Sequence, residues 1–377
     1  MKLKNKIKLV YKKIIIQLFL IIYKKPIYKN SLKLNNFHVK KFNIDKKKYK
    51  IYEINKGRVF TNKNDVTAYI TSDNIITEGS MQFKKWDVIN SRNQKLIDNI
   101  VLKNGTPNFK KNFNGNILSI LSGGAARENF THWFTDVIPR IMIFKKKFNL
   151  DDIDFIYVPS IKYKYQIESL DLLDIKSSKI ISSEKIKHIQ ANKIFYTSHP
   201  CEYYPSKTQK WSLDLLRKYY IPKKIKKNEK FRYIFIDRDQ LKLVDTQNLK
   251  NFSTWRVLLN EDEIKNYLKT LGFKIIKPEK FSLKEQIEIF YSAEVIVSLF
   301  GAAMMMLAFC NSKAKIIEIK PHKSGNEFKN ISNKLLLKHE QIKIEPKIYS
   351  EVPQNGLIFC NLDLLKEKFK KMKINFK

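Results

Sequence analysis

The feature that most constrains the fold is a regular alternation of strand-like and helix-like segments in the second half of the chain. Short apolar runs alternate there with segments whose apolar residues recur at helical spacing. The expected strands are Arg232–Ile236, Phe273–Ile276, Glu294–Leu299 and Lys315–Ile319, and the expected helices are Asn260–Leu271, Ser282–Ala293 and an apolar helix starting at Gly301. Asn260 with Glu263, and Ser282 with Glu285, fit capping boxes. This alternation predicts a doubly wound α/β domain with a parallel sheet.

The first half shows a weaker alternation, preceded by a β-rich part. Strands are expected at Ile117–Leu121, Asp154–Val158 and Lys193–Ser198, a helix at Tyr163–Leu173, and earlier β-prone pieces at Tyr49–Ile54, Val66–Thr71 and Gln82–Ile89. We therefore predict an α/β protein in four parts. They are a basic amphipathic segment at 1–30, an N-terminal α/β domain at 31–205, a C-terminal α/β domain at 206–340, and a basic tail at 341–377 with a helix at Leu362–Met372.

The N-terminal segment carries an apolar run, Ile14–Ile22, between lysines. The run is too short to span a bilayer, which needs about 20 residues. No small-residue cleavage site follows it, which argues against a secretory signal. The segment is either an interfacial helix on an anionic membrane or an ordinary helix packed on the body, and we favour the first. The predicted location is cytoplasmic, peripheral on the inner face of the plasma membrane.

The formal net charge of +37 invites a nucleic-acid interpretation. Lysines, however, are spread along the whole chain, and no nucleic-acid-binding motif accompanies them, so we expect no nucleic acid as partner. The three cysteines, Cys201, Cys310 and Cys360, lack metal-ligand spacing. They are expected to be reduced thiols in a cytoplasmic protein, with no metal site.

Arginine is scarce, with only eight among the 73 basic residues. Four of them, Arg127, Arg140, Arg238 and Arg256, lie in the segments that could carry chemistry. A planar guanidinium grips phosphate or carboxylate in a way that lysine cannot, although a structural ion pair is the alternative for each.

The stretch Ser122–Arg140 contains a glycine pair, Gly123 and Gly124, and then an amphipathic helical pattern. His132, Asp136 and Arg140 recur every four residues and form a polar stripe. With its near-neutral reference pKa, His132 suits a general base that Asp136 orients, although Asp136 could itself be the base. The alternative is a buried histidine that bonds Asp136 and holds Trp133 in the core. The other five histidines, His38, His188, His199, His322 and His339, are expected to be structural or exposed.

Further candidate residues follow strands of the second half, where ligands of α/β sheets collect. Gly301 permits close backbone approach, and small Ala302 leaves a helix N-terminus uncovered for phosphate, although a packed corner without a ligand is the alternative. Arg238 follows one strand, Arg256 lies near a helix start, and Glu318 could grip ribose hydroxyls or be a surface charge. The run Met304–Met306 is expected to fill the core.

Together these blocks resemble glycosyltransferase family 61 over roughly residues 115–320. The first block is similar to that family's pattern of Asn, an aromatic residue, His-Trp and Asp-x-x-Pro-Arg, here Asn129, Phe130, His132, Trp133, Asp136, Pro139 and Arg140. The further blocks that resemble the family are Tyr157–Ser160, Arg256 with Asn260 and Glu261, the segment from Phe281 to Val297, Gly301 with Ala302, and Ile316–Ile319.

The resemblance implies a GT-B fold of two facing Rossmann-like domains and inverting, metal-independent transfer of a hexosyl, pentosyl or N-acetylhexosaminyl group. A nucleotide sugar, with a UDP-sugar favoured, would be a substrate rather than a cofactor. The acceptor would be a glycan or lipid-linked glycan, as in bacterial capsular polysaccharide or lipopolysaccharide synthesis. His132 and Asp136 would be catalytic. The acceptor side would comprise Arg127, Asn129, Trp133 and Arg140, and the donor side Arg238, Arg256, Asn260, Glu261, Phe300, Gly301, Ala302 and Glu318.

The chain departs from the family pattern after the strand Glu294–Leu299. Phe300 and Met306 stand where the family usually has histidine and asparagine facing the donor. Two interpretations follow: an active enzyme with a diverged donor pocket, and an inactive glycosyltransferase-like binding or assembly protein. We favour the active enzyme because His132, Asp136 and the arginines are retained in a lysine-dominated chain.

Overall fold

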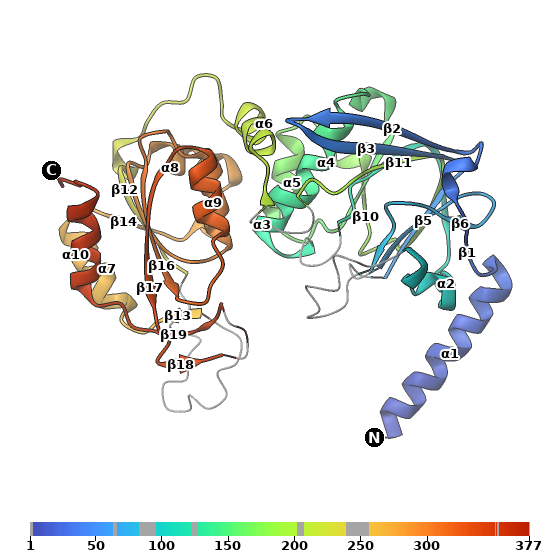
Figure 1. The fold of residues 1–377 in the computed structure, drawn as a ribbon, viewed down its shortest axis with the longest axis horizontal. Coiled ribbons are helices and arrows are strands. Elements are labelled where there is room, and N and C mark those ends of the chain that lie inside the picture. Colours follow the sequence, from blue (N-terminus) through green and yellow to red (C-terminus); the bar gives the residue numbers. More distant parts are fainter. Residues whose placement is uncertain are drawn as a thin grey trace. The chain divides into compact units, whose positions relative to one another are not determined.

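The computed structural model describes residues 3–62, 66–82, 96–122, 127–201, 207–238, 256–350, 352 and 354–376. The chain forms two compact units, Met1–Tyr204 (unit 1) and Pro205–Lys377 (unit 2) (Figure 1). Two sequence predictions lie outside the described residues: the glycine pair Gly123–Gly124 and most of the strand Gln82–Ile89.

Unit 1 is built on a mixed 11-stranded sheet. Its strands are β1 (Ile27–Tyr28), β2 (Phe37–Ile44), β3 (Lys47–Asn55), β4 (Arg58–Thr61), β5 (Val66–Ile70), β6 (Ile75–Ile76), β7 (Met81–Gln82), β8 (Lys111–Ser119), β9 (Phe155–Val158), β10 (Ile180–Ser182) and β11 (His188–Thr197). Strands β8 to β11 are parallel, as expected, but β11 also pairs antiparallel with β3 and β4. The β-rich part and the alternating part therefore share one sheet and one core.

The helices of unit 1 are α1 (Leu3–Tyr23), α2 (Val101–Asn104), α3 (Phe130–His132), α4 (Ile138–Phe144) and α5 (Lys164–Asp171). Helix α1 is attached through its last turns, where Phe19 packs edge-on against Phe109 at 5.0 Å and Tyr23 Oη accepts a hydrogen bond from the backbone N of Lys110. The rest of α1 extends away from the sheet (Figure 1). Among the described residues, no helix is long and apolar enough to cross a membrane.

Unit 2 contains a five-stranded parallel sheet in the order β14-β12-β15-β16-β17. Its strands are β12 (Tyr233–Ile236), β14 (Lys274–Ile276), β15 (Val295–Leu299), β16 (Lys315–Pro321) and β17 (Lys338–Ile344), and a smaller sheet holds β13 (Arg256–Leu258), β18 (Ile348–Tyr349) and β19 (Gly356–Ile358). The first strand of the large sheet lies between the second and the third, so the strand order reverses between β12 and β15. Ligands of such sheets bind at that switch point, beyond the carboxyl ends of the strands.

Helices cover both faces of the unit 2 sheet. Helices α7 (Glu261–Thr270) and α10 (Leu362–Lys371) lie on one face, and α8 (Leu283–Ser292) and α9 (Glu327–Lys334) on the other (Figure 1). Helix α6 (Lys210–Tyr220) packs with α8 and α9 against the 3₁₀ helix Ala302–Phe309. The C-terminal residues belong to this unit, because α10 contributes Leu365 and Phe369 to its core.

Local sequence signals are confirmed at α8 and corrected at α7. Ser282 and Glu285 form the expected capping box of α8. Asn260 does not cap α7; its amide exchanges two hydrogen bonds with the backbone of Cys360, at 2.8 and 3.0 Å. The apolar helix after Gly301 is 3₁₀ rather than α, and its methionines are buried, which confirms their core-filling role.

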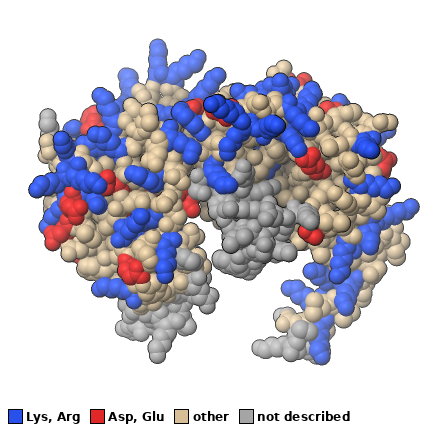
Figure 2. All heavy atoms as spheres, in the orientation of Figure 1, with Lys and Arg blue, Asp and Glu red and all other residues tan. Residues whose placement is uncertain are grey.

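Basic residues are distributed over the surface, as their spread along the sequence predicts. Figure 2 shows lysine and arginine over both units on the face drawn, without a single basic patch. All three cysteines are buried free thiols, as expected for reduced residues.

Candidate functional site

In unit 1 the predicted pair His132 and Asp136 is in direct contact. Nδ1 of His132 lies 2.6 Å from Oδ2 of Asp136. Asp136 belongs to a π-helical turn, Trp133–Val137, between α3 and α4, and Pro139 follows in the first turn of α4. Proline lacks the N–H that would bond the carbonyl four residues earlier, so it favours a break in the α-helical ladder here. The π turn precedes Pro139 accordingly.

The carboxylate of Asp136 is buried and surrounded by donors. Oδ1 accepts a hydrogen bond from Thr135 Oγ1 at 2.7 Å and from Cys201 Sγ at 3.0 Å. Burial alone would raise the pKa of Asp136, but attraction to His132, the hydrogen bond from that ring, and His199 hold it well below its ordinary value. Asp136 is therefore ionised, Nδ1 of His132 donates to it, and the lone pair of the neutral imidazole lies on Nε2.

His199 and Cys201 are site residues that the sequence analysis missed. Nε2 of His199 lies 3.8 Å from Oδ2 of Asp136 and 3.2 Å from Ser122 Oγ. Of the two expectations for His199, a structural or an exposed ring, the first describes it, because the side chain is buried among polar partners. The available signal was the His-Pro-Cys sequence directly after strand Lys193–Ser198, because side chains at the ends of parallel strands gather at one edge of a sheet.

The four residues assigned to the acceptor side have polar partners within unit 1. Asn129 caps α3 through Thr131 N, and the indole N–H of Trp133 donates to Ser169 Oγ at 2.7 Å. Arg127 pairs with Glu184 at 2.6 Å. Arg140 is 1% exposed and donates to the backbone oxygens of Asp136 and Thr197, at 3.1 and 2.7 Å. Trp133 and Arg140 are fully buried and hold the π turn in place. Contact of any of the four with an acceptor stays a prediction.

One group in the described part of the chain has the composition of a metal site. The ligand atoms of Asp136, His199 and Cys201 lie within 4.8 Å of one another, and a carboxylate, imidazole and thiolate suit zinc. The backbone N of Cys201, however, donates to Nδ1 of His199 at 3.2 Å. The neutral ring therefore carries its proton on Nε2, the nitrogen that faces Asp136, where a metal ligand needs a lone pair. This donor set fits a hydrogen-bonded network better than a metal ion.

In unit 2 two predicted arginines converge on one carbonyl. Nη1 of Arg238 donates to the oxygen of Phe300 at 2.9 Å, and Nη1 of Arg256 donates to the same oxygen. Burial, and repulsion by Arg238, lower the pKa of Arg256 to about 9; burial lowers that of Arg238 to about 10. Gly301 allows the approach, because a Cβ there would lie 2.8 Å from Nη1 of Arg238. Arg238 follows β12 and Phe300 follows β15, so this cluster lies at the switch point of the sheet.

The ring of Phe300 lies among cations and aromatic residues. The guanidinium of Arg256 lies 4.4 Å from the ring centroid, and Lys320 Nζ lies 5.2 Å from it. The ring also contacts Phe328 edge-on at 5.2 Å and is 5% exposed. Phe300 therefore offers its ring to protein cations.

The remaining donor-side residues are placed as follows. Glu261 starts α7 and is buried beside Lys265. Ala302 starts the 3₁₀ helix after the Gly301 corner. Glu318 is fully buried in β16, where Oε2 accepts from Gln341 at 2.6 Å, and Oε1 has no hydrogen-bond partner among the described residues. The surface-charge alternative for Glu318 is therefore wrong, and its contact with ribose stays a prediction.

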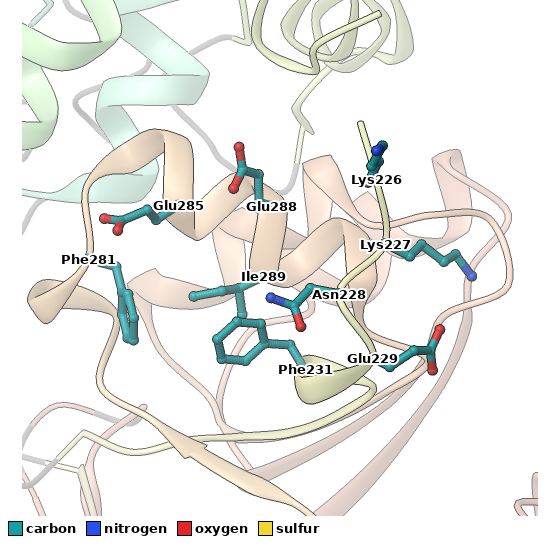
Figure 3. Close-up of a pocket in the computed structure, with 9 residues that line it drawn as sticks. All are labelled: Lys226, Lys227, Asn228, Glu229, Phe231, Phe281, Glu285, Glu288 and Ile289. Atoms are coloured by element: carbon teal, nitrogen blue, oxygen red, sulfur yellow. The ribbon is translucent and has the colours of Figure 1, made fainter. Parts of the chain in front are cut away.

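A cavity of about 530 Å³ lies elsewhere in unit 2, between α8 and the segment that precedes β12 (Figure 3). The side chains of Phe231, Ile289 and Asn228 point toward one another there, while Glu288 points away (Figure 3). None of the predicted donor residues lines this cavity.

The geometry defines a chain with a histidine–aspartate pair in one α/β unit and an arginine cluster at the switch point of another. The family model Glycosyltransferase 61 matches residues 130–317, which include both groups. The chain belongs to glycosyltransferase family 61. Membership implies glycosyltransferase activity, with a nucleotide-sugar donor and a glycan acceptor in general terms. No curated protein matches the chain.

Proposed function

We propose that the chain is an inverting glycosyltransferase in which His132 is the general base. The observation that carries this proposal is the 2.6 Å contact between Nδ1 of His132 and the ionised carboxylate of Asp136. The acceptor hydroxyl gives its proton to Nε2 as its oxygen forms a bond to the anomeric carbon. The bond from that carbon to the diphosphate breaks, and its electron pair leaves with the phosphate oxygen. Asp136 stabilises the imidazolium that forms.

The arginine cluster supports a nucleotide-sugar site in unit 2. Arg238 and Arg256 place two positive charges on one backbone oxygen, and an incoming diphosphate would offset their repulsion and stabilise the leaving group. We favour a UDP-sugar donor and transfer of a hexosyl, pentosyl or N-acetylhexosaminyl group without a metal ion. The strand order of unit 2 supports a Rossmann-like domain of a GT-B enzyme, although the sheet of unit 1 is mixed.

Helix α1 supports a location at an anionic membrane. Its exposed apolar residues recur at helical spacing along one side, at Ile7, Tyr11, Ile14, Leu18 and Ile21. Lysines are dense along the same helix, so a cytoplasmic, peripheral position suits both. Such a position suits lipid-linked acceptors in capsular polysaccharide or lipopolysaccharide synthesis. Deleting residues 1–25 is expected to move the chain from the membrane fraction to the soluble fraction; an unchanged distribution contradicts this role.

The base assignment is tested with His132→Ala and a panel of nucleotide sugars. Loss of a general base lowers kcat by about 10²- to 10⁴-fold, while nucleotide binding and folding persist. The control is His38→Ala, a change at an exposed histidine of β2 in the same unit. Full residual activity of His132→Ala refutes the assignment.

The second candidate is an inactive glycosyltransferase-like binding or assembly protein. It is favoured by Phe300 and Met306, which replace the family's polar donor-facing residues and are buried. A nucleotide-sugar panel read by thermal shift separates the two candidates. Stabilisation together with turnover supports the enzyme, and no stabilisation by any nucleotide favours the second candidate.

A further inference from the structure

The end of β11 and the segment that follows it approach the π turn of unit 1 through Thr197, His199 and Cys201. The carbonyl of Thr197 accepts a hydrogen bond from Arg140 Nη1 at 2.7 Å, which joins the end of β11 to α4. Beyond it, His199 and Cys201 both face the carboxylate of Asp136. Both side chains are buried, so they act on the protein rather than on a ligand.

Cys201 lies where Pro139 interrupts the helical hydrogen bonds. Its Sγ is 3.0 Å from Oδ1 of Asp136 and 3.7 Å from the carbonyl oxygen of Thr135. Thr135 is four residues before Pro139, so no backbone N–H of that proline can reach this carbonyl. Because Asp136 is ionised, the thiol donates its hydrogen to the carboxylate.

His199 lies beside the same carboxylate, beyond hydrogen-bond distance from it. Since the backbone N of Cys201 donates to Nδ1 of His199, the neutral ring carries its hydrogen on Nε2. That nitrogen lies 3.2 Å from Ser122 Oγ and 3.8 Å from Oδ2 of Asp136. Burial lowers the pKa of His199 to about 3, although Asp136 acts in the opposite direction, so the ring stays neutral and does not compete with His132 as a base.

We propose that Cys201 is a positioning residue for transfer: its thiol holds the carboxylate of Asp136 so that the carboxylate accepts from Nδ1 of His132 and fixes the tautomer with the lone pair on Nε2, while His199 packs beside the carboxylate as a neutral ring. This inference rests on the proposed role of His132 as base. Among the described residues, the carboxylate is faced by Thr135 and His132 from the helical turns and by His199 and Cys201 from the segment after β11. Arg140 of α4 donates to the backbone oxygen of Asp136.

Removing one donor has a defined electrostatic consequence. A carboxylate that accepts fewer hydrogen bonds interacts more strongly with the donor that remains, which is the N–H of His132. It therefore stabilises the protonated form of the His132 ring. The imidazolium of His132 then releases its proton at higher pH. The acidic limb of the pH profile of kcat/KM therefore moves upward, while a change that only loosens packing leaves the limb in place.

The experiment compares Cys201→Ala, Cys201→Val and Cys201→Ser in the full chain. Alanine and valine remove the donor, and valine keeps the volume; serine keeps an O–H donor. We expect the first two to lower kcat about 5-fold at unchanged KM and to raise the acidic limb by roughly half a pH unit, and serine to restore both. Cys310→Ala, which removes a buried thiol of unit 2, is the matched control and leaves the limb unchanged.

An NMR titration of the His132 ring without substrates separates this inference from the proposed function. The signal is assigned through its loss in His132→Gln. An upward shift of this titration in Cys201→Ala, absent in Cys201→Ser, supports the positioning role even if no nucleotide sugar turns over. A titration identical to the unmodified chain in both alanine and valine variants overturns it, and so does a serine variant that shifts as far as alanine.

Discussion

The two candidate regions bury charges of opposite sign in different surroundings. Around Asp136 in unit 1, one negative charge accepts hydrogen bonds from Thr135, Cys201 and His132. At the switch point of unit 2, two positive charges share the carbonyl of a single residue, Phe300. In the first arrangement, donors of the protein itself satisfy the buried carboxylate. The second places two like charges near each other, with Glu261, Glu318 and Glu327 as acidic neighbours, and an anionic ligand would be attracted to the two arginines.

The largest expected effect is on the stability of unit 1 in acid. Burial lowers the pKa of His188 and of His199 from 6.5 to about 3, so between these values each ring binds a proton only on unfolding. Above pH 6.5 both rings are neutral in the folded and unfolded states, and the full free energy of unfolding is present. This free energy falls as the pH is lowered from 6.5 toward 3. For both rings the free energy of unfolding falls by about 2.7 kcal/mol per pH unit. Hydrogen exchange of β11 amides between pH 7 and 4 measures this slope.

The variant His188→Asn sharpens that test. It removes one of the two rings, so the slope is expected to fall to about half, whatever the overall loss of stability. The amides of β16 in unit 2 serve as internal reference. A slope that is the same with and without His188 contradicts the assignment of its proton uptake.

The next largest effect concerns the affinity of unit 2 for a diphosphate. Arg256→Met removes one of the two charges at Phe300, and loss of a charge-assisted bond to phosphate costs about 1.5–3 kcal/mol, or roughly 10- to 100-fold in Kd. Calorimetric titration with UDP measures the change. The control, Arg232→Gln, removes an arginine that pairs with Glu294 at the surface. Equal losses in the two variants would show a general charge effect instead of a site.

The smallest effect is expected at the Gly301 corner. In Gly301→Ala, the new Cβ meets the guanidinium of Arg238, which can shift because it is the end of a flexible side chain. The affinity for UDP is expected to fall only about 2- to 5-fold. The double variant with Arg238→Met should bind no more weakly than Arg238→Met alone. Additive losses would mean that Gly301 acts independently of Arg238.

The sequence predicted the parts of the structure that depend on local periodicity. Strands β12, β14, β15 and β16 of unit 2, the capping box of Ser282, and the contact of His132 with Asp136 follow from spacing alone. The partners of Asp136 could not be predicted in the same way, because His199 and Cys201 reach it across more than 60 residues through sheet pairing. Asn260 was predicted from local sequence to cap α7. Its side chain instead makes a tertiary hydrogen bond with the backbone of Cys360.

The shared carbonyl of Phe300 also bears on the lifetime of the protein before it meets its donor. Burial, more than the repulsion of Arg256 by Arg238, makes these two guanidinium charges unfavourable in ligand-free unit 2. A nucleotide diphosphate that binds only the folded state stabilises it in proportion to the logarithm of ligand concentration over Kd. Resistance of unit 2 to proteolysis would then rise with the supply of nucleotide sugar, so that the abundance of the chain follows the availability of its substrate.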